Sequence, residues 1–159
     1  MAWTDSRIFR EWLVTAYQSA GTSFTGLDSD TVSVALFNNS VTPDRDAAVG
    51  STGFNTGTWT TTNEVTDATN WVSGGRTLAS KTFTTPSTGV FMFDGADLAG
   101  GGTVTITNAF GCLVYDNTIS GGTVADQGVS FNYFGGAQSV TAGTFTIIWH
   151  ANGINRITV

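Results

Sequence analysis

The sequence predicts a mainly β protein: a single β-sandwich, jelly-roll-like or barrel domain with one N-terminal α-helix. Three observations lead to this prediction. Short runs of alternating apolar and polar residues recur along the chain, turns rich in Gly, Asn and Asp separate them, and one stretch alone has helical periodicity. Many short strands at such spacing are typical of sandwiches and barrels. Because the 159 residues contain no visible repeat or linker, we expect one domain over 1–159.

The helical stretch lies in TDSRIFREWLVTAYQSAG, near the N-terminus. Its apolar residues recur at steps of one and four, which places them on one face of a helix. Asp5 or Ser6 can cap the start of this helix, and Gly21 can end it. We therefore expect a helical segment over 1–22 and a β-sandwich body over 30–159. The apolar stripe consists of Ile8, Phe9, Trp12, Leu13, Ala16 and Tyr17.

The aromatic residues of this segment allow two interpretations. In the first, they pack against the sheet of their own domain. In the second, Trp3, Phe9 and Trp12 dock onto a partner subunit, because aromatic residues dominate the energy of protein interfaces. These three residues are therefore the candidate intersubunit contacts.

Beyond residue 30 the periodicity changes from helical to alternating. Val32, Val34 and Leu36 of TVSVALF alternate with other residues and predict a strand with one buried face. NNSVTPD then ends the pattern, and 42–58 is expected to form a long surface loop. Further strands are expected in TWTTTNEV (58–65), ASKTFTT (79–85), GVFMFD (89–94), GTVTITN (102–108), FGCLVYD (110–116), GVSFNYF (128–134), TFTIIWHA (144–151) and INRITV (154–159).

Asn152 and Gly153 lie between the last two expected strands. An Asn-Gly pair in this position predicts a β-hairpin with a type I′ turn, which needs positive φ at both central residues. We interpret the pair as a structural turn and expect the flanking strands to pair with each other. His150, the only histidine, lies beside this turn. The chain supplies neither a G-x-S-x-G motif nor a second zinc-binding histidine, so we predict no catalytic role for His150.

The composition argues against several classes of partner. The net charge is −6, only 11% of the residues are charged, and the six basic residues are scattered. We therefore expect neither nucleic-acid binding nor attachment to an anionic membrane. No apolar run reaches 18 residues, and no signal peptide is expected. Cys112 lies among apolar neighbours and is predicted to be a small buried residue of a protein that folds in a reducing cytoplasm.

Other polar clusters predict turns rather than sites. The carboxylates of 28–30 and 44–46 stand two residues apart, as in some calcium loops, but the Gly and Glu spacing of an EF-hand is missing. Capping and turn roles fit them better. The glycine clusters AGGGT and GGRT lack the strand and helix context of a phosphate-binding loop. The sequence therefore predicts no enzyme, no catalytic residue, no metal site and no cofactor.

Several stretches together resemble a known family. They are the N-terminal helix followed by DTVSVALFNNSVTPD, then NEVTDATNWVSGGRTLAS, FGCLVYDNT and ADQGVSFNYFGGAQSVTAGTFTIIWHANGI. They resemble the capsid-decoration (head cement) proteins of tailed phages of actinobacteria. The resemblance covers most of the chain, and it consists of strands and turns rather than of a chemical motif.

This resemblance implies a β-rich cement protein on the outside of an assembled icosahedral shell. It implies the major capsid protein as a partner, a homotrimer as the common oligomer, and synthesis in the cytoplasm of the bacterial host. No catalytic or cofactor residues come with it. Trp3, Phe9 and Trp12 then become candidate contacts to the capsid as well as between subunits.

Two other functions stay open at this point. The first is a tail-tip, fibre or other host-adhesion module that binds glycans through exposed aromatic rings. The second is a small β-sandwich hydrolase, which would need a cleft with converging carboxylates. Asp94 and Asp97 of FDGADLAGGG are carboxylates that we expect in a turn.

Overall fold

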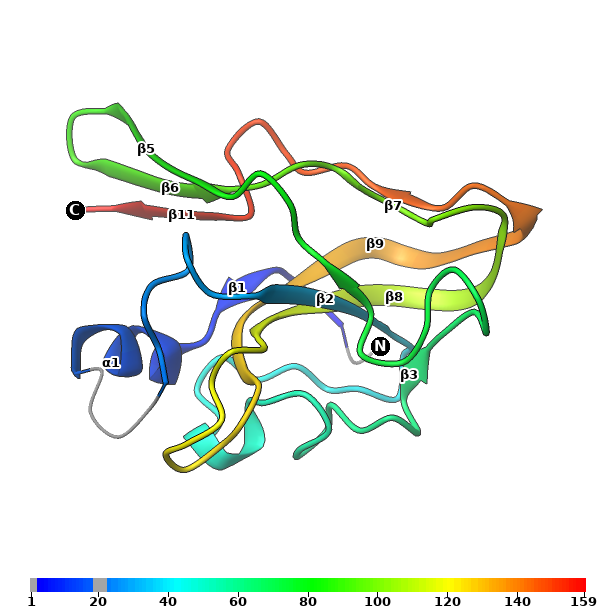
Figure 1. Cartoon of the computed structure of the whole chain (residues 1–159), viewed down its shortest axis with the longest axis horizontal. Helices are drawn as coiled ribbons and strands as arrows, with labels where there is room; N and C mark the ends of the chain where they lie inside the picture. Colours follow the sequence, from blue (N-terminus) through cyan, green and yellow to red (C-terminus); the bar gives the residue numbers. More distant parts are fainter. Residues whose placement is uncertain (1–2, 19–22) are drawn as a thin grey trace.

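Three antiparallel sheets and one α-helix make up the fold, which confirms the prediction of a mainly β protein (Figure 1). The computed structural model describes residues 3–18 and 23–159. Within these residues no sheet closes into a barrel, and the arrangement is sandwich-like. The sequence left the choice between a sandwich and a barrel open, and the strand order decides it.

The largest sheet has six strands and lies at the centre of the molecule. Its strands follow the order β1-β9-β8-β2-β3, and β4 also pairs with β2. All of these pairs are antiparallel. The strands are β1 (Arg7–Ile8), β2 (Val32–Phe37), β3 (Glu64–Val65), β4 (Arg76–Thr77), β8 (Val104–Asp116) and β9 (Gln127–Gly143).

Two smaller sheets lie over one face of the central sheet (Figure 1). One has the order β11-β6-β5, and the other pairs β10 with β7. Helix α1 (Arg10–Gln18) and the short 3-10 helix η1 (Val49–Ser51) lie on the other side of the central sheet. No helix in the described part of the chain is long and apolar enough to cross a membrane. The strands of the small sheets are β5 (Thr82–Ser87), β6 (Val90–Asp94), β7 (Leu98–Ala99), β10 (Thr146–Ile147) and β11 (Asn155–Thr158).

Strand β2 is buried along its whole length. The alternation of Val32, Val34 and Leu36 predicted one buried face, but Ser33 and Phe37 on the opposite face are buried as well. A strand is buried on both faces only where other elements cover both sides of its sheet. The small sheets cover one side, and a layer of aromatic side chains covers the other.

This aromatic layer consists of Trp3, Phe9, Phe37, Trp59 and Phe131, all of them at most 2% exposed. Trp59 lies at its centre. Its ring centroid is 5.1 Å from that of Phe37, 5.7 Å from Trp3, 6.0 Å from Phe9 and 6.1 Å from Phe131. Most of these contacts are edge-to-face, the geometry that aromatic pairs favour. The layer joins the N-terminal segment, the loop before β3 and the central sheet.

Two glycines in the central strands make room for this layer. A Cβ atom on Gly111 of β8 would lie 2.4 Å from Cζ3 of Trp3, and one on Gly128 of β9 would lie 2.7 Å from Cε2 of Phe9. Both distances are too short for real contacts. The rings therefore rest directly on the strand backbone.

The N-terminal segment is part of the sheet rather than a separate helical unit. Arg7 and Ile8 pair with Phe131 and Ser130 of β9, so the helix begins only at Arg10 and not at the predicted cap. The predicted helix end at Gly21 lies outside the described residues. At Arg7 and Ile8, backbone pairing with the edge of β9 therefore determines the structure, although the sequence pattern is helical.

The candidate contacts Trp3, Phe9 and Trp12 are core residues. Trp3 and Phe9 are fully buried and Trp12 is 4% exposed. The indole Nε1 of Trp3 donates to the carbonyl oxygen of Asn38 at 2.9 Å, and the Trp12 ring packs edge-on against Phe24. The structure thus favours packing in the domain's own core over docking onto a partner, because these side chains present almost no surface.

Two predicted strands merge and a third is longer than expected. The runs 102–108 and 110–116 form the single strand β8 of 13 residues, and β9 extends to Gly143. Register shifts between β8 and β9 let the two strands bend together without ending. Turn-like residues such as Asn108, which has a φ of 57°, therefore lie inside a strand.

Two other predicted strands are mostly loop. Of 58–65 only Glu64–Val65 is a strand, and of 144–151 only Thr146–Ile147 is one. The apolar side chains of these runs fill the core from loops, as Trp59 does. The long loop predicted at 42–58 has η1 as its one described element of regular structure.

The terminal hairpin prediction is wrong, although the turn exists. Gly153 N donates to His150 O at 2.7 Å, so Ala151 and Asn152 are the central residues. Of these turn residues only Gly153 has a positive φ, at 75°, so the turn is not of the predicted type I′, which needs positive φ at both central residues. The flanking strands pair elsewhere, β10 with β7 and β11 with β6. The turn thus carries the chain from one small sheet to the other.

Replacing the central ring of the aromatic layer tests its contribution to stability. We expect Trp59→Ala to lower the free energy of unfolding by about 3–5 kcal/mol, because the cavity would border four other rings. Urea denaturation measures this, with Ile148→Ala as a control at a side chain that is 75% exposed. Equal denaturation midpoints for Trp59→Ala and the parent protein would contradict the role given to the layer.

Candidate functional site

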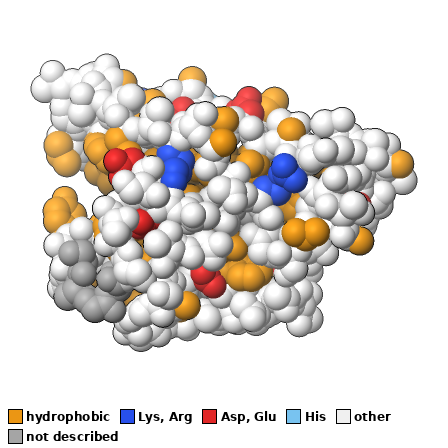
Figure 2. Space-filling view, in the orientation of Figure 1, with side chains coloured by type: hydrophobic (Ala, Val, Ile, Leu, Met, Phe, Trp, Pro, Cys, Tyr) orange, Lys and Arg blue, Asp and Glu red, His pale blue; other side chains and the backbone are white. Residues whose placement is uncertain are grey.

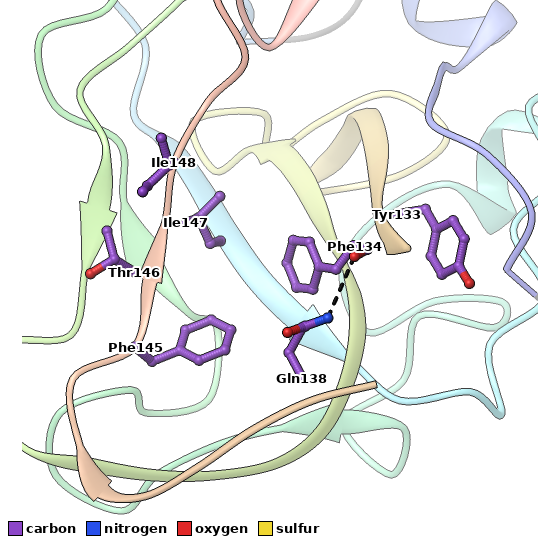
Figure 3. Close-up of a pocket in the computed structure, with 7 residues that line it drawn as sticks. All are labelled: Tyr133, Phe134, Gln138, Phe145, Thr146, Ile147 and Ile148. Carbon is purple, nitrogen blue, oxygen red and sulfur yellow. Dashed lines mark hydrogen bonds between the residues drawn. The ribbon is translucent and has the colours of Figure 1, made fainter. Parts of the chain in front are cut away.

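A groove of about 350 Å³ lies where the middle of β9 faces β10 and the residues on either side of it (Figure 3). Tyr133, Phe134 and Gln138 of β9 line one side, and residues 145–148 line the other. Gly135 and Gly136 both have positive φ and lie between these β9 residues. The chain thus bends next to the groove, at a place where two glycines tolerate the backbone conformation.

The walls of the groove are mainly aromatic and aliphatic. The ring centroids of Phe134 and Phe145 are 6.3 Å apart, and Trp71 packs edge-on behind Phe145 at 5.5 Å. Gln138 Nε2 donates to the carbonyl oxygens of Phe134 at 3.5 Å and Gly136 at 3.4 Å. Figure 3 shows the Gln138 amide between the two phenyl rings.

The chemistry of this groove suits binding rather than proton transfer. Its lining includes no Asp, Glu, His, Lys, Arg or Cys. Aromatic rings and one fixed amide are groups that bind the apolar face and a hydroxyl of a small ligand. The sequence did not predict this groove. The strand on one side was expected to end at residue 134, and the segment on the other side was expected to pair within the terminal hairpin.

A pair of buried carboxyl groups lies at the start of β2 and the end of β8. Asp30 is 2% exposed and Asp116 is fully buried, and the two carboxyl groups are close enough for each to shift the pKa of the other. Asp116 Oδ1 accepts from Thr118 N at 2.9 Å. Its Oδ2 is buried and has no hydrogen-bond partner among the described residues, which suits an oxygen that carries the proton.

The two carboxyl groups differ in pKa. Burial, reinforced by the charge of Asp30, raises the pKa of Asp116 to about 7. Burial acts on Asp30 in the same direction, but hydrogen bonds from the Thr25 hydroxyl and backbone N and from Gly26 N outweigh it and lower its pKa. Lys81 Nζ also donates to the Asp30 carbonyl oxygen. Together these bonds fix the loop before β2.

The Asp30–Asp116 pair is buried, and its contacts connect the loop before β2 to the end of β8. The turn and capping role expected for 28–30 agrees with the hydrogen bonds that Thr25 and Gly26 donate to the Asp30 carboxylate. The sequence did not identify Asp116 as its partner. Val32 and Asp116 are opposite each other in the register of β2 and β8, and that long-range pairing brings the carboxyl groups together.

The other carboxylates considered from the sequence lie in loops, except Asp94, which was expected in a turn but is the last residue of β6 and pairs with Thr82 of β5. Asp44 Oδ1 accepts from Asp46 N at 2.9 Å, and Asp97 Oδ1 accepts from Trp149 N at 3.0 Å. Asp94 Oδ1 accepts from Gly95 N at 2.9 Å. In residues 3–18 and 23–159, no group of three or more His, Cys, Asp or Glu side chains is placed to hold a metal ion.

His150 and Cys112 have structural positions. His150 Nδ1 accepts from Asn152 N at 3.1 Å, inside the turn that Gly153 closes. Cys112 is fully buried, as predicted, and burial raises the pKa of its thiol.

Comparisons of this chain with protein-family models, with curated proteins and with solved structures found no significant match.

The Asp30–Asp116 pair makes stability depend on pH. The unfolded chain releases the Asp116 proton near the ordinary value of 3.8, whereas the folded protein keeps it up to about pH 7. The folded state therefore binds more protons between these values, and stability falls as the pH rises from about 4 to about 7. Asp30 has the opposite effect, because its pKa is lowered on folding. Its contribution to the free energy of unfolding is present above about pH 4 and is lost as the pH falls below that value.

We expect Asp116→Asn to remove the loss of stability near neutral pH, because an amide can donate to Asp30 without a charge. At pH 8 this variant should be more stable than the parent by roughly 1–3 kcal/mol, and at pH 4.5 the two should be similar. Urea denaturation at both pH values measures the difference, with the exposed Asp28→Asn as control. A gain of the same size at both pH values would show that the effect is not the titration of Asp116.

Proposed function

We propose that this protein is a non-enzymatic structural protein of a phage virion that binds the outside of the capsid as a cement protein. The resemblance of its sequence implies this role, with the major capsid protein as partner and a homotrimer as the oligomer. The observation that supports it best is the small sheet β11-β6-β5, which offers a neutral surface suited to contact with another protein.

This sheet projects beyond the central sheet at the end of the molecule that holds the C-terminus (Figure 1). Strand β5 is an edge strand, and all six of its residues are exposed. Phe83 and Phe91 are 38% and 40% exposed, and their ring centroids lie 5.2 Å apart. An open strand edge beside exposed aromatic rings is a common site of protein association.

Charge contributes little on the face of the molecule seen in Figure 2. Most of its surface is neutral, and the few charged side chains are scattered. Hydrophobic side chains lie along the lower side of the projecting sheet, at the left of the view. Contact with a shell would therefore depend on shape and on apolar burial, and the centre of such an interface is enriched in aromatic residues.

The trimer would strengthen such a contact. A 16.6 kDa subunit offers only a modest patch, so a single contact would dissociate readily. Three linked copies make the second and third contacts intramolecular, which raises the overall affinity by roughly 10²–10⁴. A closed threefold ring also fits the local threefold positions of an icosahedral shell.

A second candidate function is a tail-tip, fibre or host-adhesion module that binds glycans. The aromatic groove of Figure 3 favours it, because sugars stack their apolar faces on aromatic rings and bond to amides. The two functions differ in where the protein lies on the virion. Antibody labelling of purified particles over the whole head supports the cement protein, and labelling of tails alone supports the adhesion module.

A matched pair of variants tests which surface meets the shell. We expect Phe91→Thr to bind purified heads at least tenfold more weakly than the parent, because it removes an exposed ring from the projecting sheet while keeping a residue that favours strands. Ile148→Thr, in the groove of Figure 3, should bind heads as the parent does. Occupancy is measured by quantitative cosedimentation, and circular dichroism melting checks that both variants fold. Loss of head binding by Ile148→Thr alone would move the contact to the groove.

A further inference from the structure

A second groove, of about 330 Å³, runs between β1 of the central sheet and β11 of the small sheet. Arg7, Arg45 and Arg156 line it, together with the polar side chains of Ser6, Asn132 and Asn155. The three arginines come from the N-terminal strand, the loop after β2 and the last strand. Only the tertiary fold places them around one space.

This groove holds half of the positive charge of the chain. Three of the six basic residues line it, and no acidic residue does. The remainder of the chain then has twelve acidic and three basic residues. The groove therefore gathers positive charge on a protein that is otherwise strongly acidic, and Asp5, Asp44 and Asp46 lie in the adjoining hollow beside Arg7 and Arg45.

The guanidinium groups of Arg45 and Arg156 keep donors for a ligand. Arg7 is engaged at both terminal nitrogens, with Nη2 at 2.8 Å from Asp5 and Nη1 donating to Ser6 O at 3.1 Å, whereas the contact of Arg45 with Asp46 uses its Nε at 3.4 Å. Arg156 Nη1 donates to the Asn152 side-chain oxygen at 2.6 Å and has no acidic partner among the described residues. The terminal nitrogens of Arg45 likewise have no partner there. Planar guanidinium groups with free N–H bonds bind carboxylates in a two-pronged geometry.

We propose that this arginine groove binds surface carboxylates of a second copy of the same chain. The acidic remainder of the surface complements the groove, and the same acidic field repels nucleic acid and other long polyanions. The groove and the carboxylates outside it are different parts of the surface, so the contact is head-to-tail. Repeated contacts of this kind close into a ring when the rotation between copies allows it. That the ring is a trimer rests on the proposed function, and the arginine groove would be the interface between its subunits.

Sedimentation velocity of the full chain at about 20 mM and about 300 mM NaCl tests the proposal, because screening weakens exposed charge contacts. We expect self-association at low salt that weakens at least tenfold at high salt. The double variant Arg45→Gln/Arg156→Gln should associate at least tenfold more weakly than the parent at low salt. Arg10→Gln is the matched control, since Arg10 is exposed, pairs with Glu11 and Asp46 and lies outside the groove.

The proposal is overturned if the parent stays monomeric at low salt, or if the double variant associates as the parent does. Head binding of the same proteins is measured separately, so that the two proposals can fail independently. If heads bind the parent while the double variant still self-associates, the cement role stands and the arginine groove does not. If groove-dependent association occurs but heads bind neither protein, the groove stands and the cement role does not.

Discussion

The packing of five aromatic rings on one face of the central sheet is the interaction on which the rest of the structure depends. Trp59 reaches this face from a loop, Trp3 and Phe9 come from the N-terminal segment, and Phe37 and Phe131 belong to the sheet itself. Together they let a strand as apolar as β2 lie buried on both sides. The N-terminal segment is held in the fold by the same rings, so it cannot leave to bind a partner without exposing the core.

Because the N-terminal aromatic residues are buried in the core, other molecules can be bound only by other parts of the surface. The projecting sheet has exposed phenylalanines and a free edge, the groove beside the bend of β9 has rings and an amide, and the arginine groove has charge. These surfaces differ in chemistry and would attract different partners. A cement protein that forms a ring needs one surface for the shell and another for its neighbours, and the first and third of these suit those two tasks.

The buried Asp30–Asp116 pair connects two parts of the fold, but burying its carboxyl groups costs free energy of desolvation. It ties the loop before β2 to the end of β8, and hydrogen bonds compensate for the burial of Asp30. Asp116 avoids a buried charge by keeping its proton, which is why its pKa is raised. Pairs of this kind hold a particular register between strands, since a shift by one residue would separate the two carboxyl groups.

The sequence by itself determined the features that depend on neighbouring residues. The alternation and the Gly, Asn and Asp turns predicted a mainly β chain, the apolar surroundings of Cys112 predicted its burial, and Asn152 and Gly153 marked a turn. Only the tertiary structure decided which strands pair, because the partner of a strand is chosen by contacts between distant parts of the chain. It therefore replaced the expected terminal hairpin with two separate pairings. It also placed Trp3, Phe9 and Trp12 in the core, joined Asp30 to Asp116, and gathered three scattered arginines around one groove.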